Sequence, residues 1–398
     1  MTTRSRWLLP DGVDEQLPSE AARLEMLRRQ VLDVFRVWGY RLCIPPQVEF
    51  LDSLLSGIGE DLELQTFKLT DQVSGRMLGV PADMTPQVAR IDAHRLPTEG
   101  PQRLCYLGPV LHTVPDKFAG SRNPLQVGAE LYGHAGIESD GEIICLMLAV
   151  LHELGIDEII LDLGHMQIFR GLVNAAGLDH ATEHELRESL LRKSGLDTEQ
   201  ILRQAGVSAT LSPLFRALVT LSGGVDVLTR AARELAAAPA TVREALSALT
   251  ALVKLIGARR PEVEFHIDLA ELRGYHYHTG PMFGAYTRSQ GRVIAWGGRY
   301  DNIGAEFGRA RPATGFSADL KLLSAICPHA ASLECAIYAP HDNDPTLIAE
   351  INRLRHSGRI VIQALPTQVG GARELGCQES LSKDGATWQV GKIEPKKD

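Results

Sequence analysis

The sequence of 398 residues lacks several features that would assign a protein to a class. Its six cysteines are scattered without a CxxC pair, which disfavours a disulfide framework or a zinc site and is typical of reduced thiols. No apolar run approaches the ~20 residues of a membrane helix, and the N-terminus has no apolar signal-peptide core. We therefore expect a cytoplasmic protein that makes no contact with a membrane.

The chain also lacks an excess of positive charge. The formal net charge is -8 at pH 7, which argues against broad nucleic-acid binding because such binding needs a basic surface. The pair Gly297-Gly298 lacks the GxxxxGK[ST] spacing of a phosphate loop, and Cys105 has no evident base beside it. A hydrophobic fraction of 44% is ordinary for a globular protein, and the length suggests two or three domains.

Helical and strand patterns together predict an α+β fold. An amphipathic helix is expected over 17–40, where Pro18-Ser19 opens an apolar stripe and Gly39 closes it. Short apolar stretches bounded by turn residues predict a largely antiparallel sheet. The expected strands are 41–44, 76–80, 104–111, 126–132, 158–163, 263–269, 282–287 and 292–296, and further helices are expected at 142–154 and 316–326.

Composition divides the chain into a core and a tail. Within a core of 1–327, Ala, Leu, Arg and Glu dominate from about 167 to 261, which predicts a helical insertion. Capping-box spacing marks its expected helix starts. The three pairs are Thr182 with Glu185, Asp197 with Gln200, and Thr241 with Glu244. In the tail, 328–398, a strand, a helix after Asp344-Pro345, a second strand and a last strand at 388–393 predict a small α/β domain.

Three segments carry polar side chains on otherwise apolar stretches: 81–90, 106–130, and 272–280 with 297–301. Asp83 and Glu130 are the carboxylates, and a buried carboxylate is costly unless it is paired. On a strand that faces a cavity, a carboxylate suits an ammonium or an imidazole, and Arg273 could hold a carboxylate with its two-pronged guanidinium. The alternative is a set of internal ion pairs, which the residues alone do not exclude.

Histidines near the third segment raise a second alternative. His276 and His278 alternate as strand residues do, and His266 and Asp268 stand close by in sequence. A metal site is therefore geometrically possible. No cysteine lies beside these histidines, and no residues that would orient metal ligands are evident in the sequence around them. We therefore favour a polar pocket wall and expect no metal.

Taken as a set, the three segments resemble histidyl-tRNA synthetase, a class II aminoacyl-tRNA synthetase. The stretch from Gly108-Pro109 to Glu130 matches the second class II motif, and 273–277 resembles the signature Arg-Gly-Leu-Asp-Tyr-Tyr. The stretch 297–316 resembles the entry to the third motif, and Pro46 matches the first-motif proline of the dimer interface. The resemblance covers about 5–327 and implies a mostly antiparallel sheet flanked by helices.

The resemblance also implies a histidine-binding site. The positions that contact bound histidine in that family carry Asp83, Thr85, Gln126, Glu130, Arg273 and Tyr277 here. Asp83 stands where the family has a glutamate, and His276 replaces an aspartate.

The positions that grip ATP depart from the synthetase pattern. The second-motif Phe-Arg-x-Glu reads Leu111-His112-Thr113-Val114 here, and Leu322 occupies the arginine position of the third motif. Adenylyl transfer depends on positioned positive charge, which neither a mostly neutral His112 nor Leu322 supplies. We therefore expect no amino-acid activation by this chain.

A synthetase-like core without ATP grips and with a short tail resembles the ATP phosphoribosyltransferase regulatory subunits. The segments Leu9-Pro10-Asp11-Gly12 and 82–87 also resemble that family. The resemblance implies a non-catalytic subunit without a cofactor. It further implies a short-form catalytic subunit as partner, a homodimer within a hetero-octamer, and L-histidine as effector. Two alternatives remain: an active histidyl-tRNA synthetase, which His112, Val114 and Leu322 disfavour, and a tRNA-sensing pseudo-synthetase, which the acidic charge and short tail disfavour.

Overall fold

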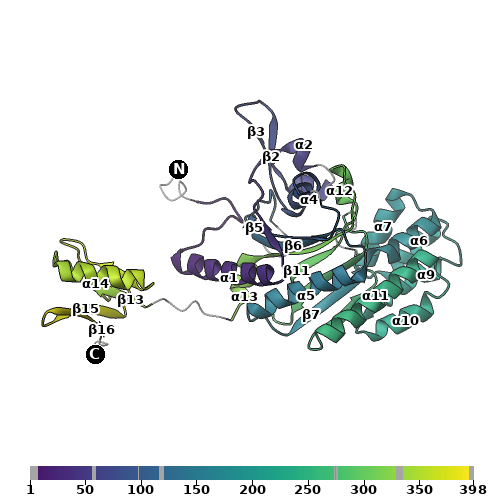
Figure 1. The fold of residues 1–398 in the computed structure, drawn as a ribbon. Helices are drawn as coiled ribbons and strands as arrows, with labels where there is room; N and C mark the ends of the chain where they lie inside the picture. The colour runs from purple at the N-terminus through teal and green to yellow at the C-terminus, as the bar shows by residue number, and fades with distance from the viewer. Residues whose placement is uncertain are drawn as a thin grey trace. The chain divides into compact units, whose positions relative to one another are not determined.

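A nine-stranded sheet organises the larger part of the molecule (Figure 1). In the computed structural model, which describes residues 8–55, 60–96, 98–115, 121–272, 274, 277–328 and 335–393, two strand pairs of this sheet are parallel and the others antiparallel. The order across the sheet is β1 (Arg41–Cys43), β5 (Gln102–Pro109), β6 (Leu125–Tyr132), β12 (Ala313–Asp319), β11 (Val293–Arg299), β10 (Pro281–Thr287), β7 (Ile159–His165), β9 (Glu264–Asp268) and β8 (Ser222–Gly223). Together with the helices on its faces, this sheet confirms the α+β fold class.

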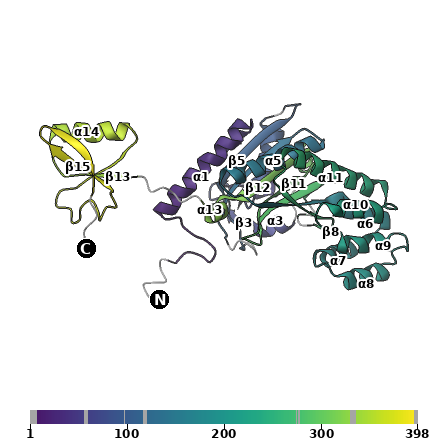
Figure 2. The ribbon, with the colours of Figure 1, turned by 90° about the horizontal axis from the view of Figure 1, so that it is seen from below.

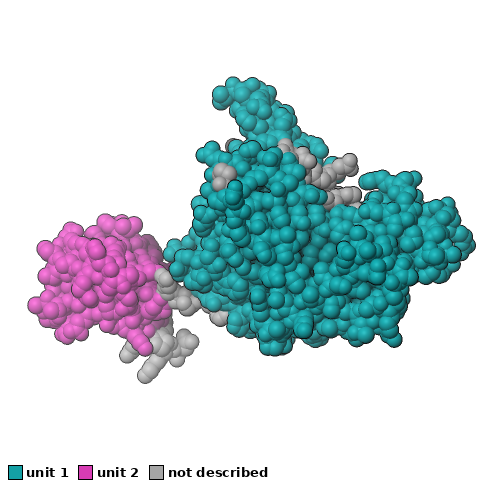
Figure 3. Space-filling view, turned by 45° about the vertical axis from the view of Figure 1, so that its right-hand side comes forward, with its two compact units in different colours: residues 1–329 teal, residues 330–398 magenta. Residues whose placement is uncertain are grey.

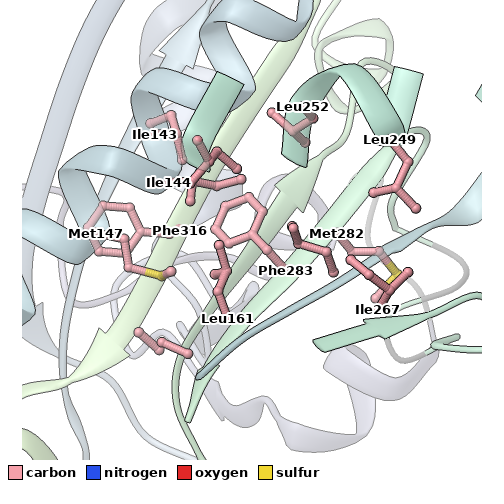
Figure 4. Packing of buried hydrophobic residues seen from close by; sticks show 14 of the residues in the cluster. Ile143, Ile144, Met147, Leu161, Leu249, Leu252, Ile267, Met282, Phe283 and Phe316 are labelled. Atoms are coloured by element: carbon pink, nitrogen blue, oxygen red, sulfur yellow. The ribbon is translucent and has the colours of Figure 1, made fainter. Parts of the chain in front are cut away.

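The main hydrophobic core fills the space between one face of this sheet and a layer of helices. Alternate strand residues such as Val127, Ala129 and Phe316 point into it, because successive side chains of a strand face opposite ways. Figure 4 shows Ile143 and Ile144 of α5 packed beside Phe316. The covering helices are α1 (Pro18–Val37), α5 (Ile137–Glu153), α6 (Met166–Ala176), α11 (Ala240–Arg259) and α13 (Leu320–Ile326).

The opposite face of the sheet carries a second, smaller core. Met84, directly before α4 (Thr85–His94), and Val88 within it belong to one buried cluster with three tyrosines. These are Tyr106 of β5, Tyr132 of β6 and Tyr300, which directly follows β11. A three-stranded sheet lies beyond β1 in sequence, in the order β2-β4-β3. The strands of this small sheet are β2 (Glu49–Phe50), β3 (Phe67–Thr70) and β4 (Met77–Val80). The short helices α2 (Leu51–Leu54) and α3 (Glu60–Gln65) lie between β2 and β3 in sequence, and α12 (Ile303–Glu306) contacts α4.

Helices between β7 and β9 form a group at one end of the sheet, as Figures 1 and 2 both show. Besides α6 and α11 the group contains α7 (His180–Leu191), α8 (Gly195–Gln204), α9 (Ser212–Thr220) and α10 (Asp226–Glu234). The predicted capping boxes were wrong. Asp179 and Ser194 cap α7 and α8, three residues before Thr182 and Asp197, and each accepts a hydrogen bond from the later residue's N–H. Pro239 precedes α11, so Thr241 lies inside that helix.

The prediction of one helix over 316–326 was also wrong. Residues 313–319 form β12, and the helix α13 begins only at Leu320. Phe316 is buried in the main core from a strand, whereas Asp319 accepts a hydrogen bond from the Lys321 N–H at 3.0 Å and so starts the helix. Burial of this stretch on both faces hides the alternation that would have marked it as a strand.

Residues 330–398 form a separate compact unit (Figure 3), described here by itself. The predicted strand-helix-strand unit is confirmed, because β13 (Ala336–Ala339) and β14 (Ile360–Gln363) are parallel and α14 (Pro345–His356) connects them. The strand β15 (Glu379–Asp384) was not predicted, since only Leu381 of its residues is buried. It pairs with β13 and with β16 (Thr387–Lys392). Among the described helices of the chain, none is long and apolar enough to cross a membrane.

Candidate functional site

Glu130 lies at the centre of the candidate site, on the face of the sheet that α4 covers. Its side chain belongs to β6 and is 1% exposed. Gly315 lies opposite it on β12, and a Cβ added there would come within 1.5 Å of the Glu130 Oε2 atom. Glycine is therefore required at position 315 to leave room for this carboxylate.

Two tyrosines hold the Glu130 carboxylate. The Tyr106 hydroxyl donates to Oε1 at 3.0 Å, and the Tyr300 hydroxyl donates to Oε2. The Thr85 Oγ1 atom lies 3.0 Å from the Tyr106 oxygen. Because Tyr106 gives its only proton to Glu130, Thr85 is the donor to Tyr106. Four polar side chains thus form one buried hydrogen-bonded chain.

Burial raises the pKa of Glu130 to about 8, and the charge of Asp83 adds to the shift. The hydrogen bonds from Tyr300 and Tyr106 oppose it, because they stabilise the ionised form. A carboxyl group with a pKa near neutrality gains negative charge readily when an N–H donor or a cation approaches. Such a group suits an imidazole, whose own pKa is ordinarily about 6.5.

This pKa predicts a pH dependence of stability. A carboxyl whose folded pKa lies above its unfolded value contributes stability that is complete below about pH 4.5 and is lost as pH rises through about 8. We expect the free energy of unfolding of the ligand-free protein to fall by up to about 1.4 kcal/mol per pH unit from this group. Urea denaturation between pH 5 and 8 should show that slope relative to Glu130→Gln. Parallel stability profiles for the two proteins would contradict the assignment.

A second carboxylate, Asp83, lies at the start of α4. Its Oδ1 atom accepts hydrogen bonds from the Gln126 Nε2 and from the Thr85 N–H, each at 2.8 Å. The Gln126 Oε1 atom accepts the Met84 N–H at 2.8 Å. Asp83 is half-buried and is held in one orientation by these two hydrogen bonds, which both reach Oδ1. Gln126 therefore positions Asp83.

Tyr277 brings a third element to the site. Its ring stacks on that of Tyr300, with centroids 5.1 Å apart and planes 27° apart. Among the described residues its buried hydroxyl finds no hydrogen-bond partner, which is costly unless a ligand supplies one. Arg273 and His276 lie outside the described residues, so the predicted carboxylate contact of Arg273 stays a prediction.

The positions that resemble ATP grips are occupied in other ways. The His112 Nε2 atom donates to the Ala82 carbonyl at 2.9 Å, which ties the ring to the backbone beside Asp83. Val114 is 56% exposed. Leu322 is 9% exposed and packs in the main core from α13. None of the three side chains can offer a guanidinium to a phosphate.

The sequence argument missed two residues that complete the site, Tyr106 and Tyr300. Both lie inside the polar segments that it singled out, but a tyrosine on a strand is more often a packing residue than a ligand to a carboxylate. Arg299, from the same segments, lies elsewhere. Its guanidinium pairs with the buried Asp140 at 3.0 Å and bonds to the start of α5.

Two of the residues considered as metal ligands are engaged in pairs within the described part of the chain. His266 contacts Asp162 and Ser222, and Asp268 pairs with Lys193. Burial lowers the pKa of His278 to about 4, which leaves its ring neutral. Over the described residues no group of three or more His, Cys, Asp and Glu side chains could hold a metal ion.

Comparison with known proteins places the chain. The family model for histidyl-tRNA synthetase matches residues 12–323, and the model for the ATP phosphoribosyltransferase subunit HisZ C-terminal domain matches 334–391. The ATP phosphoribosyltransferase regulatory subunit of Alkalilimnicola ehrlichii is 52% identical over 387 residues, 96% of each chain. That of Methylococcus capsulatus is 53% identical over 388 residues, 97% of this chain and 96% of its own. The chain belongs to the family of ATP phosphoribosyltransferase regulatory subunits.

Solved structures agree with this family. An ATP phosphoribosyltransferase regulatory subunit/histidyl-tRNA synthetase from Bacillus halodurans matches with a TM-score of 0.81 at 25% identity, over 94% of this chain and 97% of its own. Histidyl-tRNA synthetase from Nostoc sp. PCC 7120 matches with a TM-score of 0.77 at 19% identity, over 94% of this chain and 91% of its own, and shows the shared fold. A class II synthetase-like fold is thereby confirmed, as is membership in the family of ATP phosphoribosyltransferase regulatory subunits.

Proposed function

We propose that this regulatory subunit binds the short-form catalytic subunit of ATP phosphoribosyltransferase, activates it, and transmits feedback by L-histidine in the first step of histidine biosynthesis. One contrast in the structure supports the proposal. The amino-acid side of the site keeps a built cluster around Glu130, whereas His112 and Leu322 leave the nucleotide side without a cation at either grip position. A site of this kind can sense an amino acid without activating it.

Histidine fits the cluster in one orientation. Glu130 accepts from the imidazole, and the unsatisfied Tyr277 hydroxyl adds a second contact. Asp83 and Thr85 hold the ammonium group, with Gln126 fixing the carboxylate of Asp83. In this proposal Arg273 takes the ligand carboxylate by its fork geometry. Since leucine or phenylalanine would leave these buried polar groups unpaired, histidine should be strongly preferred.

Feedback requires that histidine favour one of two conformations of the complex, with a coupling free energy of about 1–3 kcal/mol. No cofactor enters this mechanism. We place the complex in the cytoplasm and assign it a hetero-octameric form built on a homodimer of this chain.

Co-purification tests the proposal. The tagged chain should retain the short-form catalytic subunit, and the catalytic activity should be higher in the complex than in the catalytic subunit alone. Histidine should then inhibit the complex. Failure of the two proteins to associate at micromolar concentration would contradict the proposed role. A tRNA-sensing subunit would instead bind tRNA with high affinity and leave the catalytic subunit unbound.

The homodimer is proposed to form along β1, the edge strand of the large sheet. Among the described residues β1 pairs with β5 alone, so its other edge offers backbone groups to a second chain. Ile44, directly after β1, is 78% exposed, and Pro45-Pro46 follow it. An apolar side chain in that position favours a protein interface.

We expect Ile44→Asp to convert the dimer into a monomer, because a carboxylate at the interface would be desolvated without a partner. Analytical ultracentrifugation at micromolar concentration measures the change. Val73→Asp is the matched control, since Val73 is 95% exposed at the turn after β3. If Ile44→Asp stays dimeric, the dimer uses another surface.

A further inference from the structure

Away from the Glu130 cluster, Ser222, His266 and Asp162 form a second polar group. The His266 Nδ1 atom lies 2.8 Å from Asp162 Oδ1, and its Nε2 atom lies 3.2 Å from the Ser222 Oγ atom. With Asp162 ionised, Nδ1 carries the ring proton and donates it. Nε2 is then the acceptor, and the Ser222 hydroxyl donates to it. This is the relation of nucleophile, base and orienting carboxylate that activates a serine.

The strands place this group on an accessible part of the sheet. Leu161, Leu163 and Ile267 point into the main core, so the alternating Asp162 and His266 point to the opposite face. Asp162 lies opposite His266 in the parallel pair of β7 and β9. The His266 side chain is 40% exposed, whereas that of Asp162 is 11% exposed. A base that solvent reaches and a carboxylate that it barely reaches suit proton transfer to a bound molecule.

Ser222 stands where the edge strand β8 turns into α10. Gly223 has a φ of 141°, which side chains rarely adopt, and Gly224 follows before α10 begins at Asp226. Two glycines after the serine leave its hydroxyl open to approach and carry no side chain that would shield their backbone N–H groups. A sharp strand-to-helix turn is also how hydrolase folds present a nucleophile.

An apolar surface lies in the same cross-strand row. Asp162 is opposite Gly284 of β10, and Gly284 is opposite Trp296 of β11. Trp296 is 46% exposed at the middle of a central strand, where large apolar side chains are ordinarily covered. Adjacent strands are about 4.8 Å apart, so the indole lies two strands, or roughly 10 Å, from Asp162 but four strands, or roughly 19 Å, from Ser222 on β8. A small ester at Ser222 therefore lies clear of the indole.

We propose that Ser222, His266 and Asp162 form an esterase site that hydrolyses a small carboxylic ester. The Ser222 oxygen attacks the ester carbonyl carbon while its proton moves to the His266 Nε2 atom. The ester C–O bond then breaks, and the leaving alkoxide takes that proton. Water attacks the acyl-serine in the same way, releasing the carboxylic acid and returning the proton to Ser222.

The charged neighbours of His266 set its pH dependence. The hydrogen bond to Asp162 raises the pKa of His266, Asp268 raises it further, and Lys193 lowers it. Because the base must be neutral to accept a proton, acylation should speed up as pH rises through a pKa above 6.5, the ordinary value of the group.

Labelling of the full-length protein by an aryl fluorophosphonate tests the proposal, because this probe phosphonylates an activated serine and releases fluoride. We expect one label per chain, located at Ser222 by peptide mass, and at least a tenfold loss of labelling rate in His266→Ala. Asp162→Asn should slow labelling as well, with the pH profile shifted. The matched control is Ser247→Ala, whose hydroxyl donates to the Arg243 carbonyl on α11.

Two results would overturn the site. The first is labelling of folded wild-type protein no faster than of its urea-unfolded form. The second is equal labelling of Ser222→Ala and wild type. If Ser222→Ala fails to fold, Ser222→Thr serves instead, since it keeps the hydroxyl but hinders attack and should label slowly. The proposal is independent of the regulatory role, which co-purification measures separately.

Discussion

Glu130→Ala should abolish inhibition of the assembled complex by histidine while leaving assembly and uninhibited activity intact. Truncating one partner of a buried, hydrogen-bonded charge pair costs about 2–5 kcal/mol of binding free energy, or roughly 30- to 4,000-fold in Kd. Glu130 is 1% exposed and is positioned by Tyr106 and Tyr300, so no water replaces it easily. Isothermal titration of histidine into the mutant complex measures the loss, and an inhibition curve shows its effect.

Two further variants separate binding from structural damage. Glu63→Ala removes a partly exposed carboxylate that pairs with Lys68, and it should leave inhibition unchanged. Tyr300→Phe removes one donor to Glu130 and should weaken histidine by a smaller factor than Glu130→Ala. Inhibition of the Glu130→Ala complex at wild-type histidine concentrations would show that the pocket is vestigial and that feedback arises elsewhere.

Leu322→Arg should destabilise the protein strongly and should not restore activation of histidine. Leu322 is 9% exposed in the main core, so a guanidinium there would be buried without a carboxylate partner. We expect a loss of about 3–5 kcal/mol in the free energy of unfolding, measured by urea denaturation. Leu322→Met, which conserves volume, should cost less than about 1.5 kcal/mol.

The same substitution tests the absence of catalysis. Exchange of pyrophosphate into ATP with histidine should be undetectable in the wild type, in His112→Arg, and in the double variant with Leu322→Arg. His112 is tied to the Ala82 carbonyl, and its replacement restores one grip only. Each missing grip removes on the order of 3 kcal/mol of transition-state stabilisation. Exchange at a synthetase-like rate in the wild type would contradict the regulatory assignment.

Much of the fold followed from local patterns, and the errors have physical causes. The strand-helix-strand of the C-terminal unit was predicted because Asp344-Pro345 and Gly358 bound its helix. The strand β12 was taken for a helix because both of its faces are buried and the polar alternation is absent. The capping-box predictions placed two helix starts three residues too late. Asp179 and Ser194 precede Thr182 and Asp197 by three residues, and their side-chain oxygens can cap a helix equally well.

By itself the sequence determined the class of the protein and where its polar residues lie. The resemblance to histidyl-tRNA synthetase pointed to Asp83, Glu130 and Tyr277 as candidate ligands and to positions 112, 114 and 322 as departures from its ATP grips. Once the positions are matched to that family, residue identity suffices to infer the lost grips, because a leucine cannot replace a guanidinium in any fold.

Only the tertiary structure decided which polar groups meet. Thr85, Tyr106, Glu130 and Tyr300 lie far apart in the chain, and the sheet register brings them into one hydrogen-bonded chain beside Gly315. It likewise joined Ser222 to His266 and Asp162 across the strands β7, β9 and β8. Contacts between distant strands depend on register and on which face each residue takes, and a one-residue shift would send every side chain to the other face.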